Sequence, residues 1–127
     1  MRSRLLASTG ALALTLGGLL VSAGPAAAAT DPAHCYGWSH GNYYSGGGIH
    51  FLDGGTQIRR GPYTDCTAFG SGYAGQGINV ECSVVNRTST YWLYVVDTTT
   101  GVAGWSAWSA LDHPGVSLSN IPGCPEP

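Results

Sequence analysis

The clearest pattern of apolar and polar positions lies in the second half of the chain. From Ile78 to Val84 the apolar residues fall on one face and the polar residues on the other. Alternation with a period of two is typical of a strand with one buried face. Tyr91 to Val96 is a run of rings and branched side chains, and Val102 to Trp108 follows after a turn. The pattern therefore predicts three strands, connected by polar turns.

Shorter elements precede these three strands. Gln57 to Arg59 predicts a strand that enters a turn at Gly61 and Pro62, Cys66 to Phe69 predicts another, and Gly70 to Gly77 forms a glycine-rich connection. Strands at intervals of about 8 to 12 residues, with no helical period between them, are typical of a small barrel or sandwich. We therefore expect an all-β domain over residues 56–111.

The segments on either side of this domain have different compositions. Residues 30–55 are rich in glycine and rings and predict an irregular N-terminal arm, with one short strand at Ile49 to Leu52. Residues 112–127 contain four prolines and predict a C-terminal coil. We therefore expect one domain with an arm before it and a tail after it.

Residues 1–29 have the composition of a secretory signal peptide. Arg2 and Arg4 precede an apolar run from Ala11 to Val21, and small residues from Pro25 to Ala29 follow. An uncleaved membrane anchor is the alternative, but the apolar run is shorter than the roughly 20 residues that a membrane span needs. We expect cleavage before Thr30 and an extracellular protein, either free or associated with the cell wall.

The charge of the exported part argues against a nucleic-acid partner. Residues 30–127 contain no lysine and only three arginines, Arg59, Arg60 and Arg87, against seven acidic residues, which gives a net charge of −4. Nucleic acids are bound through clusters of lysine and arginine. No such cluster is present in the sequence, and no contact with a membrane is expected after cleavage.

Four cysteines, Cys35, Cys66, Cys82 and Cys124, follow the predicted signal peptide. An even number of cysteines in a short exported chain implies two disulfides, for which three pairings are possible. We favour Cys66 with Cys82, across a strand, a glycine turn and a returning strand, which leaves Cys35 with Cys124. A zinc site is the alternative, but no C-x-x-C or H-x-x-x-H spacing supports it.

Motifs for catalysis and cofactors are weak. Gly70 to Gly75 fits G-x-G-x-x-G, but a strand is predicted after it, where a dinucleotide site needs a helix. No G-x-S-x-G elbow occurs, and the carboxylates are scattered through turns and polar strand faces. We therefore expect no catalytic residue, no cofactor and no metal.

Four short segments occur in an order typical of one family. They are Ile58 to Pro62, Gly75 to Gly77, Tyr91 to Val95, and Gly104 with Trp105. In this order and spacing, the stretch from Thr56 to about Leu111 resembles the bacterial SH3 (SH3b) domain. Ser106 departs from the family, since a branched apolar residue usually follows the Gly-Trp pair, and Trp108 is an additional ring.

This resemblance implies a small SH3-like barrel that binds cell-wall peptides. The cysteine pair Cys66 and Cys82 is similar to one in exported single-domain SH3b proteins of Gram-positive bacteria. The arm of residues 30–55 has no counterpart in the basic domain.

The SH3b-like stretch contains more large rings than about 55 residues can bury, and clustered exposed rings often mark a binding groove. An equally weighted alternative is that these rings pack under the N-terminal arm. The ligand-binding residues that we predict are four rings and two acids on a polar rim: Tyr63, Tyr91, Trp92, Trp108, Asp65 and Asp97.

These patterns together predict an exported, non-catalytic binding module for cell-wall peptide or a peptide-like ligand. One alternative is a small secreted inhibitor or antimicrobial toxin that acts on a protein partner, for instance through the loop Gly46 to Gly48. Another is an enzyme in which a histidine and an acid converge. The sequence does not predict the oligomeric state.

Overall fold

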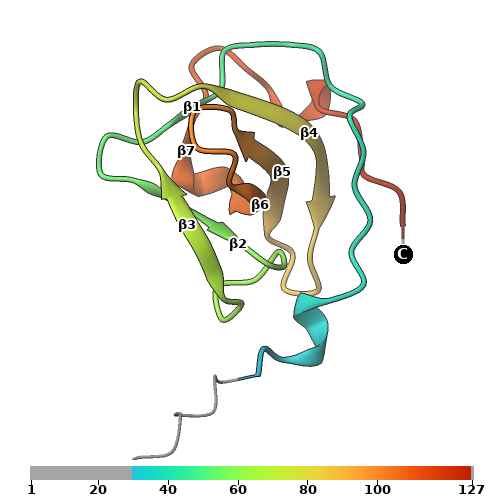
Figure 1. Ribbon diagram of the computed structural model, residues 1–127. Helices are drawn as coiled ribbons and strands as arrows, with labels where there is room; N and C mark the ends of the chain where they lie inside the picture. The colour runs from blue at the N-terminus through green and yellow to red at the C-terminus, as the bar shows by residue number, and fades with distance from the viewer. Residues whose placement is uncertain (1–29, 127) are drawn as a thin grey trace, which may run out of the picture.

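The computed structural model describes residues 30–126, so the predicted signal peptide lies outside the described residues. These residues form two antiparallel sheets and three single turns of 3-10 helix (Figure 1). The larger sheet has the strand order β3-β2-β6-β5-β4. Its strands in chain order are β2 (Thr56–Arg59), β3 (Ala68–Gly72), β4 (Ile78–Val85), β5 (Tyr91–Asp97) and β6 (Ala103–Ala107).

The smaller sheet joins the end of the arm to the segment that follows β6. Strand β1 (His50–Phe51) pairs antiparallel with β7 (Leu111–Asp112). The short helical turns are η1 (Ala33–Cys35), η2 (Trp108–Ala110) and η3 (Leu118–Asn120). None of these turns, within residues 30–126, has the length and hydropathy of a membrane-spanning helix.

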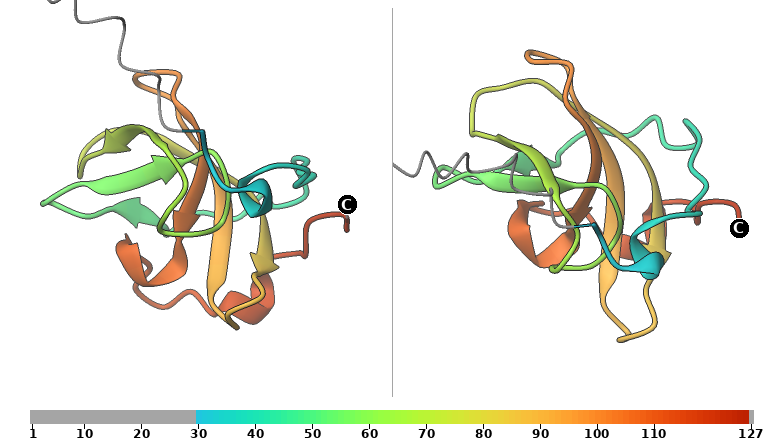
Figure 2. Two further views of the ribbon diagram at one scale, coloured as in Figure 1. Left: turned by 90° about the horizontal axis from the view of Figure 1, so that it is seen from below. Right: turned by 60° about the horizontal axis from the view of Figure 1, so that its bottom comes forward.

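The all-β fold is confirmed, but the predicted closed barrel is wrong. Strands β3 and β4 are the two ends of the larger sheet and do not pair with each other. The sheet is strongly bent, so that β2 and β3 run in a different direction from β4 and β5 (Figures 1 and 2). An open sheet leaves two strand edges whose backbone groups need other partners.

One buried core lies between the bent sheet and the segments that flank it. The strands contribute Ile58, Val80, Leu93 and Val95. Residues outside the larger sheet complete this core. The arm, β7 and the tail all bury apolar side chains in it: Ile49, Phe51, Leu111 and Ile121. The arm and the tail are therefore structural parts of the fold.

Strand β6 approaches β2 closely where Gly104 lies. A Cβ atom at this position would clash with the backbone oxygen of Arg59 and press on the side chain of Ile58. Glycine is therefore required for β6 to lie between β2 and β5, and the adjacent Trp105 is buried.

The predicted disulfide pairing is wrong. The structure joins Cys35 to Cys66 and Cys82 to Cys124, rather than Cys66 to Cys82 and Cys35 to Cys124. The prediction treated the strands on either side of the glycine turn as neighbours. In fact β3 pairs with β2 and β4 pairs with β5, so that three strands separate β3 from β4. One disulfide instead ties the arm to the β2–β3 loop, and the other ties the tail to β4.

Candidate binding groove

The free edge of β4 is partly covered by the arm and the tail, which run beside it (Figure 1). The arm donates the backbone N–H groups of Tyr43 and Tyr44 to the carbonyl of Glu81. In the tail, Pro122 accepts a hydrogen bond from the N–H of Ser83 at 2.9 Å. The carbonyl of Ser83 accepts a hydrogen bond from the N–H of Cys124 at 2.7 Å, and Gly123 forms a parallel bridge to Ser83.

Beyond Ser83, the edge of β4 is open. In an antiparallel ladder, successive residues direct their backbone groups alternately toward and away from the neighbouring strand. Ser83 directs its groups outward to the tail, so Val85 does the same. Within residues 30–126, neither the arm nor the tail bonds to Val85, whose side chain is also exposed. The N–H and C=O of Val85 are therefore available to an added strand.

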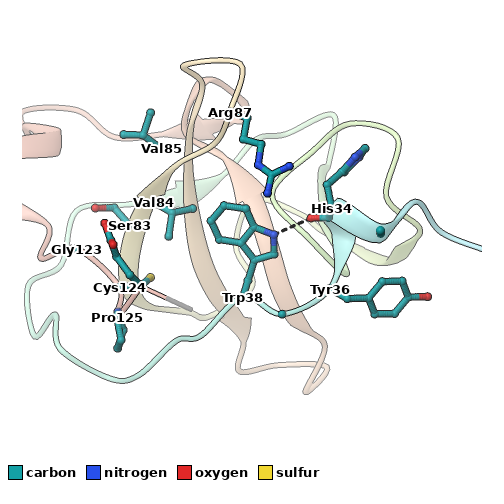
Figure 3. Close-up of a pocket in the computed structure, with 13 residues that line it drawn as sticks. His34, Tyr36, Trp38, Ser83, Val84, Val85, Arg87, Gly123, Cys124 and Pro125 are labelled. Carbon is teal, nitrogen blue, oxygen red and sulfur yellow. Dashed lines mark hydrogen bonds between the residues drawn. The ribbon is translucent and has the colours of Figure 1, made fainter.

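A cavity of about 720 Å³ lies beside this open edge (Figure 3). Its walls come from η1 and the following arm, from the end of β4, and from the tail. Trp38 occupies the middle, where its indole N–H donates a hydrogen bond of 2.7 Å to the carbonyl of His34. Arg87 and Val84 also line this cavity, which we call the edge compartment.

A second cavity of about 510 Å³ shares His34 and Arg87 with the first, and we call it the polar compartment. Tyr63, Asp65 and Trp92 line it, together with the threonines at positions 64, 88 and 90. The indole N–H of Trp92 is buried and has no hydrogen-bond partner within residues 30–126. We call the two compartments together the β4 groove.

Aromatic stacking fixes the arm that forms one wall of the groove. Trp38 lies between Tyr63 and Trp105, with ring centroids 6.1 Å from each. His34 packs on Tyr63 at 4.2 Å, and His40 stacks on Tyr94 at 3.5 Å. Several rings of the strand-rich stretch, residues 56–111, thus pack under the arm, which is the alternative that the sequence left open. Exposed rings remain both on the arm, at Tyr36 and Tyr43, and on the strand-rich stretch, at Tyr73 and Tyr91.

Carboxylates hold two of the arm's three histidines. Asp65 lies 2.7 Å from His34 Nε2, and Glu81 lies 2.8 Å from His40 Nδ1. Burial raises the pKa of Tyr94, and the charge of Glu81 adds to this increase. Tyr94 therefore remains a neutral phenol that can stack on His40.

The predicted site residues divide into two groups. Tyr63, Asp65 and Trp92 meet in the polar compartment, although the two rings are buried in its wall rather than exposed. Tyr91 is exposed but does not line the groove, and Trp108 stacks on His113 at 3.6 Å. The structure therefore gathers three of the six.

Asp97 is not a polar rim residue. Its carboxylate is fully buried at the start of the β5–β6 turn, where it accepts hydrogen bonds from the N–H groups of Thr99 and Thr100. The role of Asp97 is to shape this turn, because an Asp side chain commonly bonds to backbone groups two and three residues later.

The sequence reasoning missed Trp38, Arg87, His34 and Val85, four of the residues that build the groove. One signal could have found Trp38, because it follows a cysteine in an arm that a disulfide must hold close to the domain. Arg87 could have been found as the arginine outside the Arg-Arg-Gly-Pro turn.

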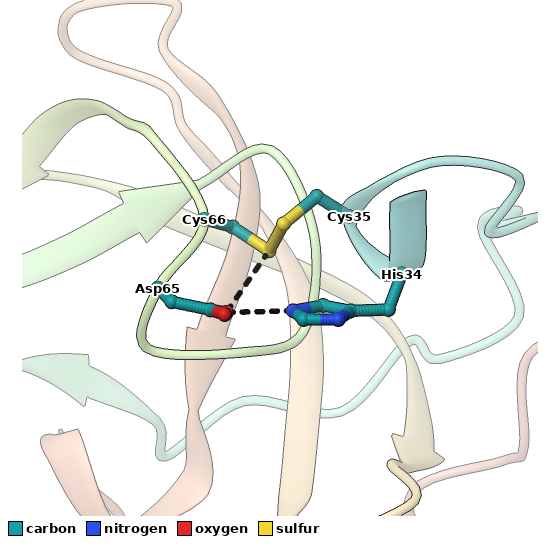
Figure 4. Close-up of side chains that lie close together, drawn as sticks. All are labelled: His34, Cys35, Asp65 and Cys66. Carbon is teal, nitrogen blue, oxygen red and sulfur yellow. Dashed lines mark hydrogen bonds and ion pairs between the residues drawn. A yellow bond between two sulfur atoms is a disulfide. The ribbon is translucent and has the colours of Figure 1, made fainter. Parts of the chain in front are cut away.

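His34, Cys35, Asp65 and Cys66 form a compact cluster at the end of the groove (Figure 4). Their potential ligand atoms lie within 4.8 Å of one another. The two sulfur atoms are bonded to each other, whereas metal ions bind the free thiolate. In the oxidised protein this cluster therefore serves as a fastening between the arm and the β2–β3 loop.

Asn86 occupies a glycosylation-like sequence, Asn86-Arg87-Thr88, but its side chain is buried and hydrogen-bonded within the protein. Its amide donates a hydrogen bond of 2.7 Å to the carbonyl of Pro62. Its carbonyl oxygen accepts bonds from the N–H groups of Thr88 and Thr90. Asn86 therefore fixes the β4–β5 turn, which carries Arg87 at the groove.

Asp31 fastens the beginning of the described chain to the β2–β3 loop. Its carboxylate accepts hydrogen bonds from the hydroxyl and the N–H of Thr67, and it pairs with Arg60 at 2.7 Å. The Thr67 hydroxyl and N–H, together with Arg60, lower the pKa of Asp31 below its usual value of 3.8. Asp31 is therefore an anion at neutral pH.

No family model matches the chain, and comparisons with curated proteins and with solved structures likewise find no match. Function therefore has to be argued from the chemistry of the β4 groove itself.

Proposed function

We propose that this chain is a secreted, non-catalytic binding protein that recognises cell-wall peptide or a peptide-like ligand outside the cell. One observation carries this proposal: the β4 groove combines an open strand edge at Val85, a central indole at Trp38 and a cation at Arg87. Peptides commonly bind by adding a strand to such an edge, while neighbouring pockets take their side chains.

The disulfides support a location outside the cell. All four cysteines are oxidised in the structure, and two disulfides in a small domain indicate an oxidising, extracellular environment. Secretion itself is part of the proposal, because the predicted signal peptide lies outside the described residues.

Kinship with SH3b domains is also part of the proposal. The strand-rich stretch of residues 56–111 and the Arg-Gly-Pro turn between β2 and β3 support it. The open sheet is a departure from a closed SH3-like barrel. The peptide-binding proposal does not depend on this kinship, because the groove lies between β4, the arm and the tail.

The test is retention of the purified protein by Gram-positive sacculi, together with the change in tryptophan fluorescence when stem or cross-bridge peptides are added. We expect retention, and a fluorescence change from Trp38 and Trp92 in the groove. The absence of both retention and a fluorescence change would disprove the proposal.

A matched pair of variants locates the site. Trp38 and Trp108 are both half-buried indoles that contact other rings, but only Trp38 lines the β4 groove. We expect Trp38→Leu to reduce retention about 10-fold and Trp108→Leu to leave it unchanged, with folding of both verified by circular dichroism. Equal retention by the two variants would place the site elsewhere.

A further inference from the structure

Arg87 is the one arginine in residues 30–126 whose guanidinium has no partner there. Arg59 donates to the carbonyl of Cys66, and Arg60 pairs with Asp31. Arg87 is exposed and lines both compartments of the β4 groove. Of the two acids that line the groove, Asp65 is bonded to His34 and Glu126 forms no ion pair with Arg87. A cation without a partner at the centre of a groove selects an anionic group on the ligand.

The position of Arg87 relative to the open strand edge gives the ligand a direction. Val85 directs its N–H and C=O out of the sheet at the end of β4, and Arg87 follows two residues later, in the β4–β5 turn. The tail already occupies the preceding outward site, where Gly123 lies parallel to β4 at Ser83. A ligand beside Val85 thus has room only on the side of Arg87.

We propose that the β4 groove binds the C-terminal end of an extended peptide, which adds to β4 at Val85 and places its free α-carboxylate against Arg87. This inference rests on the proposed function and names its ligand class. The peptide enters from the side of Arg87, because the tail occupies the side of Ser83. Its last side chains lie toward Trp38 and Val84, which line the edge compartment.

The first experiment compares two forms of one probe, a synthetic wall stem pentapeptide with a free C-terminal carboxylate and the same peptide as its C-terminal amide. Binding of each is measured by tryptophan fluorescence and by calorimetry. We expect the acid to bind at least about 10-fold more tightly than the amide, because a charge-assisted hydrogen bond to Arg87 is lost in the amide.

Two arginine variants assign this difference to Arg87. In Arg87→Gln, the acid and the amide should bind equally. In the matched control Arg60→Gln, which removes the same charge outside the groove lining, the 10-fold preference should remain. A preference that persists in Arg87→Gln, or equal binding of acid and amide to the parent protein, would overturn the inference.

The second experiment tests strand addition through amide hydrogen exchange measured by NMR. With the free-acid peptide bound, exchange of the Val85 N–H should slow at least about 10-fold. The Ser83 N–H is already bonded to Pro122, so its exchange should change little. Unchanged exchange at Val85 in the saturated complex would overturn the strand-addition mode.

These outcomes separate the inference from the proposed function. If sacculi retain the protein but neither pentapeptide binds, the inference fails and the proposed function stands. If both pentapeptides bind equally, the carboxylate site fails and peptide binding stands. If sacculi do not retain the protein and no peptide changes its fluorescence, both fail together.

Discussion

At the scale of single residues, the polar side chain of Asn86 links two turns that are far apart in the sequence. It donates to Pro62 between β2 and β3, and it accepts from Thr88 and Thr90 between β4 and β5. We expect Asn86→Ala to lower the free energy of unfolding by about 2 kcal/mol, because buried backbone groups lose their partners. Asn120→Ala, at an exposed position, should change it by less than about 0.5 kcal/mol.

Urea denaturation of both variants measures this difference. A loss at Asn86 no greater than that at Asn120 would contradict the structural role of the buried amide. It would also weaken the conclusion that this turn positions Arg87.

A second prediction at the residue scale concerns Asp31 and acid stability. Because the folded pKa of Asp31 is lowered, its ionised form stabilises the native state above the unfolded value of 3.8. This contribution is lost as the pH falls through the folded pKa. We therefore expect Asp31→Asn to be less stable at neutral pH, and to lose less stability than the parent protein between pH 5 and pH 2.

Urea midpoints recorded from pH 2 to pH 6 provide the measurement. Asp53→Asn is the matched control, since Asp53 lies in an exposed turn and its carboxylate forms no hydrogen bond within residues 30–126. Identical pH profiles for Asp31→Asn and the parent protein would show that the contacts to Thr67 and Arg60 do not matter in solution.

At the scale of elements, the sequence predicted the strands whose signal is local. The alternation from Ile78 to Val84 became β4, and the ring-rich runs became β5 and β6, with no end shifted by more than one residue. The strand predicted at Cys66 to Phe69 begins later, at Ala68, because Cys66 belongs to the loop tied to η1. Strand pairing was not predictable in this way, because β6 inserts between β2 and β5.

Each disulfide holds one wall of the groove, and this leads to a prediction for the tail. The double variant Cys82→Ser and Cys124→Ser lacks the disulfide that holds the tail over Ser83. We therefore expect the Ser83 N–H to exchange much faster in this variant. The chain-entropy model adds a global loss of about 4 kcal/mol for a loop of this length.

The Cys35→Ser and Cys66→Ser double variant is the matched control. This variant removes a disulfide that closes a loop of similar length, with a sequence separation of 31 rather than 42. The removed disulfide holds the arm instead of the tail. Its Ser83 exchange, corrected for global unfolding, should match that of the parent. Equal protection of Ser83 in all three proteins would contradict the view that Cys124 pins the tail to β4.

At the scale of the whole molecule, the candidate site joins three segments that are distant in sequence. The arm supplies Trp38, the end of β4 supplies Val85 with Arg87 beyond it, and the tail supplies Gly123. Sequence patterns identify local periodicity, but they do not show which distant segments meet. Three of the predicted residues, Tyr63, Asp65 and Trp92, therefore line the polar compartment, but none lines the edge compartment, which the disulfides assemble.

The same long-range construction predicts that residues 56–111, the strand-rich stretch, do not fold alone. A fragment of these residues lacks Ile49, Phe51 and Ile121 from the core and one cysteine of each disulfide. Burial of each large apolar side chain contributes about 2 kcal/mol, and the disulfides contribute several more, whereas small domains have little stability to lose. We expect the fragment to show poorly dispersed NMR spectra and no cooperative urea transition, while residues 30–127 with both disulfides unfold cooperatively. A cooperatively folded fragment would show that β2 to β6 form an autonomous domain, and that the arm and the tail only decorate it.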